Sequence, residues 1–394
     1  MLTDSEVAAL RSETPGVANS AYLMNAGAAL MPVQVVDAVV SHLRLEAAIG
    51  GYAAADEVSD RLDAVYDSVA SLIGAHREEV ALTENATVAW QLAFYSLDFR
   101  VGDRILTGEA EYAANYVAYL QVARRTGAVV EVVPSDESGQ LDVGALGSMI
   151  DERVRLISVT WMPTNGGLVN PAEEIGRLAR RHGIFYLLDA CQAAGQWVID
   201  VGRLGCDALT GTGRKFLRGP RGTGFLYVRR STLEQMHPPM IDHFSAPWTS
   251  LHAYTLRDDA RRFETWENAY ALRLGLGAAV DLAASIGVHR IHQRCGELAG
   301  RLRAGLTSLD RVTVHDLGAQ QSAIVSFSVD GVDAADLVNV ARNAGIVIGA
   351  SAPSSTRIDA TRRKLPVLNR ASPHYFNTVS EIDRLVDVVR TASR

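Results

Sequence analysis

The stretch "ALTGTGRKFLRGPRGTGFLYVRR", residues 208–230, decides the fold class of this chain. It contains two apolar runs, "ALTGTG" and "GTGFLYVRR", and the residues between them are too few for a crossover helix. We therefore predict that these two runs form neighbouring antiparallel strands.

Upstream of this pair, short apolar runs alternate with amphipathic segments. The amphipathic segment "PAEEIGRLARRHG" follows Asn170 and ends at Gly183, as a helix should. The apolar runs are "EVALT", "RILTG", "VVEVVPS", "VRLISVTW" and "IFYLLDA". Strands that alternate with helices imply right-handed crossovers. The sequence thus predicts an α/β fold with a mostly parallel sheet of seven strands.

The pattern of apolar and polar residues changes near residue 270, where a long helical tract begins and leads into shorter strands and helices. We predict a large cofactor-binding domain over residues 21–270. A smaller α+β domain is predicted over residues 271–394, and residues 1–20 pack with it.

The composition excludes several classes of protein. The chain has 394 residues, of which 48% are hydrophobic and 21% charged, and this is typical of a globular protein. A net charge of -7 argues against nucleic-acid binding, and no apolar run is long enough to cross a membrane. The three cysteines are widely spaced, which suggests neither a disulfide framework nor a zinc site. This usage fits a cytoplasmic protein.

Lys215 is unusual because the chain contains only one other lysine, Lys364, among 38 lysine and arginine residues. Arginine stays protonated, whereas a lysine amine can lose its proton and attack a carbonyl. A plain surface lysine is the simpler alternative, and the neighbouring residues must decide.

Polar side chains follow the predicted strands, where an open parallel sheet binds its ligands. Together they offer hydroxyls, an arginine, a carboxylate, an aromatic ring and an amine. They are Thr87, Tyr112, Thr164, Asp189, Gln192, Thr212, Arg214 and Lys215. Such a set suits one aromatic, phosphorylated, aldehyde-bearing ligand, and pyridoxal 5'-phosphate has these features.

Each residue also has a structural alternative. Asp189 follows a buried strand and could pair with a pyridinium nitrogen, or it could cap a helix. Ala86 and Thr87 could bind phosphate at a helix N-terminus, or Thr87 could be an ordinary cap. Arg370 could grip a carboxylate, or it could be one surface arginine among many.

Several motifs in this order resemble the class V aminotransferase superfamily, pyridoxal-phosphate enzymes of fold type I. The motifs are "YLMNAGAALMP", "DACQ", "TGTGRK", "GPRGTGFLYV" and "NRASPHYFNTVSEID". The resemblance implies that Lys215 bonds to the cofactor, Asp189 contacts the ring nitrogen and Gln192 the ring hydroxyl. It assigns Ala86, Thr87, Thr212 and Arg214 to the phosphate, Tyr112 to ring stacking and Thr164 to the cofactor or substrate.

The same resemblance implies an amino-acid substrate, held by Arg370 with Asn25 and Tyr52. It also implies a homodimer, in which Asn268 of the segment "RRFETWEN" reaches the phosphate of the neighbouring subunit.

The expected reaction depends on the branch of the superfamily. Cysteine desulfurases carry an acceptor cysteine on a mobile loop, and the corresponding stretch "IVIGASAPSST" has none. The segments "EAAIGGYAAADE" and "GRKFLRGPRGTGFLYVR" look more like the branch that contains hercynylcysteine sulfoxide lyase. We therefore expect a C–S β-lyase that cleaves a cysteine S-conjugate to a thiol, pyruvate and ammonia.

Other functions stay open at this point. The same site would serve an aminotransferase, an epimerase or a decarboxylative oxidative deaminase acting on a similar amino acid. A cysteine desulfurase is expected less, and a non-catalytic cofactor-binding sensor less still.

Overall fold

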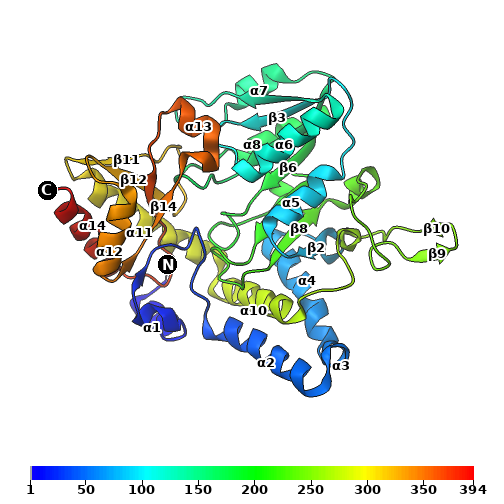
Figure 1. The fold of residues 1–394 in the computed structure, drawn as a ribbon, viewed down its shortest axis with the longest axis horizontal. Coiled ribbons are helices and arrows are strands. Elements are labelled where there is room, and N and C mark those ends of the chain that lie inside the picture. The colour runs from blue at the N-terminus through cyan, green and yellow to red at the C-terminus, as the bar shows by residue number, and fades with distance from the viewer. Residues whose placement is uncertain (1) are drawn as a thin grey trace.

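A computed structural model describes residues 2–394 and is built around a seven-stranded sheet (Figure 1). The strand order is β2-β8-β7-β6-β5-β3-β4. Only β8 runs antiparallel to its neighbours, so the sheet is mostly parallel and the predicted antiparallel pair is confirmed. The strands are β2 (Val80–Thr83), β3 (Arg104–Gly108), β4 (Val129–Val133), β5 (Val154–Thr160), β6 (Phe185–Asp189), β7 (Ala208–Thr212) and β8 (Gly224–Val228).

The central strands are buried on both faces. Leu187 joins one apolar cluster with helices α5 (Ala86–Tyr95) and α6 (Ala113–Thr126). The next residue, Leu188, joins a second cluster with helix α8 (Ala172–His182). Because successive side chains of a strand point to opposite faces, helices cover both sides of the sheet.

Further helices surround this sheet. Helix α10 (Tyr270–Ile286) packs across α2 and α4, and a short β9–β10 hairpin extends on the side of the molecule away from the C-terminal elements (Figure 1). The remaining elements of this part are α2 (Val33–Ile49), α3 (Gly51–Glu57), α4 (Ser59–Ile73), α7 (Val143–Met149), α9 (Val201–Leu204), β9 (Trp248–Ser250) and β10 (Ala253–Tyr254).

The C-terminal part forms an antiparallel sheet in the order β11-β12-β15-β14. The first helix, α1 (Asp4–Ser12), reaches it through Arg11, which lies 2.9 Å from Glu381. The division of the chain at residue 270 stays a prediction. The elements are β11 (Val312–Val314), β12 (Val325–Val329), β14 (Gly349–Ser351), β15 (Leu368–Ala371), α11 (Val288–Thr307), α12 (Ala334–Asn343), α13 (Arg357–Arg362) and α14 (Val379–Ala392), and β1 (Ala21–Tyr22) pairs with β13 (Ile346–Val347).

The long helical tract after residue 270 is two helices. Gly287 separates α10 from α11 with a φ of 89°, a conformation that glycine adopts without strain, and the helix axes bend by 80°. In the part of the chain that the structure describes, no single helix is long and apolar enough to span a membrane, although this bent pair meets the criterion by length and composition.

Candidate active site

A cavity of about 230 Å3 lies where three parallel strands end. Strand β5 ends at Thr160, β6 at Asp189 and β7 at Thr212, and all three residues line the cavity. The structure brings nine of the predicted residues together here: Ala86, Thr87, Tyr112, Thr164, Asp189, Gln192, Thr212, Arg214 and Lys215. Their individual roles stay predictions.

Lys215 lies on a tight turn that a buried arginine holds in place. Arg218 has a left-handed φ of 63°, and its backbone N–H donates to the carbonyl of Lys215 at 2.9 Å. Its guanidinium donates to the Leu30 carbonyl at 2.8 Å, to Thr14 Oγ1 at 2.7 Å and to Tyr375 Oη at 2.5 Å. This one side chain thus ties the N-terminal segment and the C-terminal part of the chain to the lysine turn.

The N-terminus of helix α5 forms the end of the cavity suited to a phosphate. Asn85 caps the helix, because its Oδ1 accepts a hydrogen bond from the Val88 N–H at 3.0 Å. The N–H groups of Ala86 and Thr87 belong to the first turn, where backbone donors and the helix dipole favour an anion. Gly224 permits this placement, since a Cβ atom there would lie 2.7 Å from the Asn85 carbonyl carbon.

Asp189 lines the same cavity at the end of β6 and is 6% exposed. Its Oδ1 accepts from the Cys191 N–H at 2.9 Å, and its Oδ2 accepts from Asn115 Nδ2 at 3.1 Å. Asn115 and Cys191 also line the cavity, and the sequence analysis did not identify either as a site residue. Burial raises the pKa of Cys191, and the nearby Lys215 acts in the opposite direction.

Arg370 adjoins the cavity through Thr164. Its Nη1 donates to the Thr164 carbonyl at 2.9 Å and to Thr164 Oγ1 at 2.6 Å. Burial, aided by Arg214, lowers the pKa of Arg370 to about 10, so the guanidinium is charged at neutral pH. Asn25 is fully buried and donates to the Ser372 carbonyl at 2.7 Å, but it does not line the cavity.

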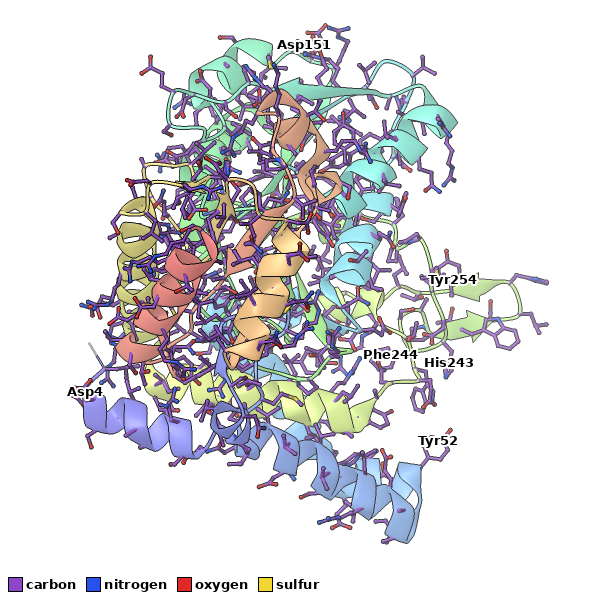
Figure 2. All side chains as sticks on the ribbon, turned by 60° about the vertical axis from the view of Figure 1, so that its left-hand side comes forward. Asp4, Tyr52, Asp151, His243, Phe244 and Tyr254 are labelled. Carbon is purple, nitrogen blue, oxygen red and sulfur yellow. The ribbon has the colours of Figure 1, made fainter. Side chains whose placement is uncertain are left out.

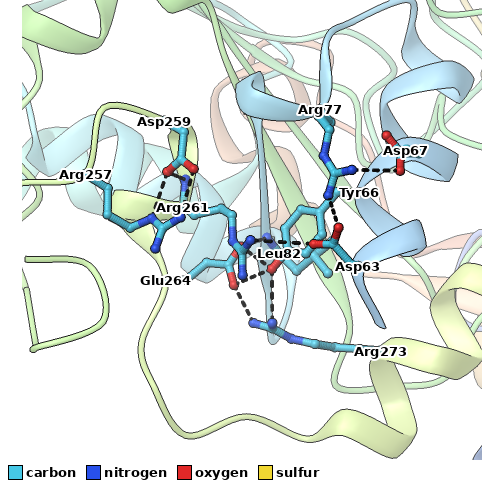
Figure 3. A network of polar contacts seen from close by, with 10 residues as sticks. All are labelled: Asp63, Tyr66, Asp67, Arg77, Leu82, Arg257, Asp259, Arg261, Glu264 and Arg273. Atoms are coloured by element: carbon cyan, nitrogen blue, oxygen red, sulfur yellow. Dashed lines mark hydrogen bonds and ion pairs between the residues drawn. The ribbon is translucent and has the colours of Figure 1, made fainter. Parts of the chain in front are cut away.

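Asn268 does not line this cavity and is hydrogen-bonded instead to Arg273. Figure 3 shows the polar network that Arg273 forms with Glu264, Tyr66 and Leu82. The Glu264 carboxylate accepts hydrogen bonds from Tyr66 Oη and the Leu82 N–H, both at 2.9 Å. Arg273 donates to the same carboxylate at 2.8 Å and to Asn268 Oδ1 at 2.5 Å. Within one subunit, Asn268 is therefore fixed outside the cofactor cavity.

Tyr52 is also outside the cavity and is 71% exposed on helix α3. Figure 2 shows its side chain pointing away from the body of the protein. Tyr52 and Asn268 border a separate groove between α3 and the start of α10. A site role for either residue requires a second subunit and stays a prediction.

The cavity fits pyridoxal 5'-phosphate. Gln192 is 3% exposed, and its Oε1 has no hydrogen-bond partner among residues 2–394, as expected of an atom that faces a ligand hydroxyl. Helix donors suit a phosphate, the Asp189 carboxylate suits a pyridinium nitrogen, and Lys215 supplies an amine in the same cavity. The fold and these side chains define a pyridoxal-phosphate enzyme of fold type I.

The chain belongs to the aminotransferase class-V family, whose model matches residues 21–385. It is 30% identical to the cysteine desulfurase of Haloferax volcanii over 380 residues, which cover 94% of this chain and 89% of the relative. The apo structure of a cysteine desulfurase from Thermococcus onnurineus matches 100% of this chain and 98% of its own, with a TM-score of 0.90 and 25% identity. The structure of a cysteine desulfurase from Escherichia coli matches 100% of this chain and 99% of its own, with a TM-score of 0.91 and 26% identity.

These relatives correct the expected reaction. The prediction of a β-lyase acting on a cysteine S-conjugate is wrong, because proteins similar over nearly the whole chain are named cysteine desulfurases. The prediction gave too much weight to one feature, the lack of cysteine in residues 346–356.

Proposed function

We propose that the protein is a cysteine desulfurase, which removes the sulfur of L-cysteine and leaves L-alanine. The observation that carries this proposal is the near full-length similarity to desulfurases, combined with a cavity that contains Lys215 and Asp189 and adjoins Arg370. The substrate class is a small amino acid. A cytoplasmic location stays a prediction.

Each of these three side chains has a distinct task in the proposal. The Arg370 guanidinium binds the substrate carboxylate, and Asp189 faces the ring nitrogen of the cofactor. Bound pyridoxal phosphate supplies an electron sink that stabilises negative charge at the substrate Cα. The Lys215 amine removes the Cα proton, and a proton is returned to Cβ once the Cβ–S bond has broken.

We further propose that the sulfur passes to a thiol from outside the chain. Residues 346–356 contain no cysteine, and there Ser351 and Thr356 are hydrogen-bonded to Asn165. Cys206 and Cys295 are at most 1% exposed, and burial raises the pKa of each to about 12. Cys191 lines the cavity, but burial raises the pKa of its thiol as well and so disfavours the reactive thiolate. In balance, the acceptor thiol loses its proton, the Cβ–S bond breaks, an S–S bond to the acceptor forms, and Cβ gains a proton. With dithiothreitol as the acceptor, its second thiol then attacks the inner sulfur, which forms the cyclic disulfide and releases the outer sulfur as sulfide.

The test is to incubate the holoenzyme with L-cysteine in the presence and absence of dithiothreitol. We expect alanine and sulfide in equal amounts, with release that depends on the added thiol and is lost in Lys215→Ala. Release of alanine at full rate without the thiol would contradict the external acceptor. The absence of alanine under every condition would contradict desulfuration.

Transamination is a second candidate, favoured by the lack of an acceptor cysteine in residues 346–356. The epimerase and the decarboxylative oxidative deaminase use the same site. Mass spectrometry of the products separates these reactions, because transamination yields an oxo acid and the amine form of the cofactor.

We also propose a homodimer. Large apolar side chains are exposed on the β9–β10 hairpin, where Trp248 is 71%, Leu251 81% and Tyr254 58% exposed. Figure 2 shows Tyr254 and Tyr52 on the same side of the molecule. Light scattering after size exclusion should give twice the 42.4 kDa chain mass.

A further inference from the structure

A second buried carboxylate lies behind Asp189, and one amide joins the two. Asn115 Nδ2 donates to Glu111 Oε1 at 2.9 Å and to Asp189 Oδ2 at 3.1 Å. Both protons of the amide are therefore used, one for each carboxylate. The three side chains are at most 6% exposed.

Glu111 is surrounded by hydrogen-bond donors. In addition to Asn115, it accepts from Thr107 Oγ1 at 2.9 Å, from the Tyr112 N–H at 2.8 Å, and from Thr160 through Oγ1 at 2.5 Å and N–H at 3.2 Å. Five donors directed at one carboxyl group suit its ionised form, which only accepts. The net effect is a raised pKa of Glu111, because burial, aided by the Asp189 charge, outweighs the hydrogen bonds from Thr160, Asn115 and Thr107, which lower it.

Neither carboxylate has an arginine or lysine partner within ion-pair distance among residues 2–394. Two buried carboxylates joined by one neutral amide repel each other unless a cation lies close by. The pyridinium form of the cofactor ring, seated at Asp189, would be that cation.

We propose that Glu111 and Asn115 are positioning residues that keep the ring nitrogen protonated. Asn115 prevents the Asp189 carboxylate from rotating, and Glu111 fixes the amide while adding a second negative charge behind it. The inference rests on the proposed seat of the ring at Asp189. On this inference, the ability of the cofactor to accept electrons depends on Asp189, Asn115 and Glu111 together, and not on Asp189 alone.

Other titratable groups near Glu111, Asn115 and Asp189 do not mask the effect of these residues on the pKa of the ring nitrogen. Burial raises the pKa of Tyr112, Tyr119 and Cys191, so these groups are neutral at neutral pH. Lys215 and Arg214 also line the cavity and are the same in every variant to be compared.

The experiment is nitrogen-15 NMR of holoenzyme loaded with pyridoxal phosphate labelled at the ring nitrogen. The nitrogen shift reports protonation directly and does not depend on turnover. In the wild type we expect the protonated signal to persist to a higher pH than in the free cofactor.

In Glu111→Gln and in Asn115→Leu, which keeps the side-chain size, the nitrogen should lose its proton about one pH unit lower. By proton linkage, this corresponds to about tenfold weaker cofactor binding at pH values below the pKa of the free ring nitrogen, a difference that disappears at alkaline pH. A purely structural role would lower thermal stability without moving this titration.

Glu109→Gln is the matched control. Glu109 directly follows β3, as Glu111 does two residues later, and its carboxylate is also buried at 7% exposure. Unlike Glu111, it accepts a hydrogen bond from Ser135 Oγ at 3.1 Å and pairs with Arg362. Its variant should retain the wild-type nitrogen titration.

The outcomes separate this inference from the proposed site. If Asp189→Asn leaves the nitrogen signal unchanged, the ring nitrogen does not bind at Asp189 and the proposed site is wrong. If Asp189→Asn moves the signal while Glu111→Gln and Asn115→Leu both match the wild type, the positioning role is overturned. If both variants fail to fold, the wild type still provides a test. The positioning role is overturned if the ring nitrogen in the wild-type holoenzyme titrates at the same pH as in the free cofactor.

Discussion

Acidification should destabilise this protein through one buried histidine beside the lysine turn. His374 is fully buried, its Nδ1 accepts from the Tyr375 N–H at 2.8 Å, and its Nε2 lies 2.8 Å from the Phe216 carbonyl, to which it donates. Phe216 is the residue after Lys215. Because Nδ1 accepts, protonation there removes a hydrogen bond and places a charge in the core.

The magnitude follows from proton linkage. Burial, with a smaller effect of Arg218, lowers the pKa of His374 from 6.5 to about 3. Below pH 6.5 the unfolded chain therefore binds more protons than the folded protein, so stability falls as the pH falls. Between pH 7.5 and pH 5.5 the loss from this residue is about 1.4 kcal/mol.

The assay is urea denaturation of the wild type and of His374→Gln at both pH values. Glutamine does not titrate, and it can accept from Tyr375 and donate to Phe216. The wild type should lose about 1.4 kcal/mol more than the variant between the two pH values. His292 and His315, whose pKa values burial also lowers, contribute equally to both proteins. Parallel losses in the two proteins would refute the reasoning.

Three further substitutions test the site. Lys215→Ala should abolish the visible absorption of the lysine-bound cofactor, as measured by absorption spectroscopy. Arg370→Lys should raise the KM for the amino acid about tenfold or more with little change in cofactor affinity, because the bidentate grip is lost. Gly224→Ala should cost about 1–3 kcal/mol in urea denaturation and weaken cofactor binding, since its Cβ would press on Asn85. Gly296→Ala is its control and should not destabilise, because beyond the backbone of its own helix turn and its chain neighbours no described residue has an atom within 4 Å of the added Cβ.

The sheet could be predicted because its strands are buried on both faces and so appear as uninterrupted apolar runs. The run ending in Asp189 and the run ending in Thr212 correspond to β6 and β7. Once the strands are parallel, their C-terminal ends share one edge, and the convergence of nine predicted residues follows from topology.

What the sequence could not provide is contact between elements distant along the chain. Glu111 stands after β3 and Asn115 lies four residues later, on the first turn of α6. Glu111 precedes the helix by two residues, so the Asn115 amide reaches it locally, but only the folded sheet brings Asp189 to the same amide. Asn268 and Tyr52 illustrate the converse, since motif order predicted site residues that one subunit does not bring to the cavity.

The expected reaction failed because bond cleavage and sulfur acceptance were treated as one requirement. Cleavage of a Cβ–S bond depends on the groups around the cavity, namely Lys215, Asp189 and the donors behind it. Acceptance needs only a thiol that reaches the departing sulfur, and that thiol can come from outside the chain. A chain can therefore lose the acceptor cysteine of residues 346–356 and keep the chemistry of a desulfurase, provided that the cavity admits an external thiol.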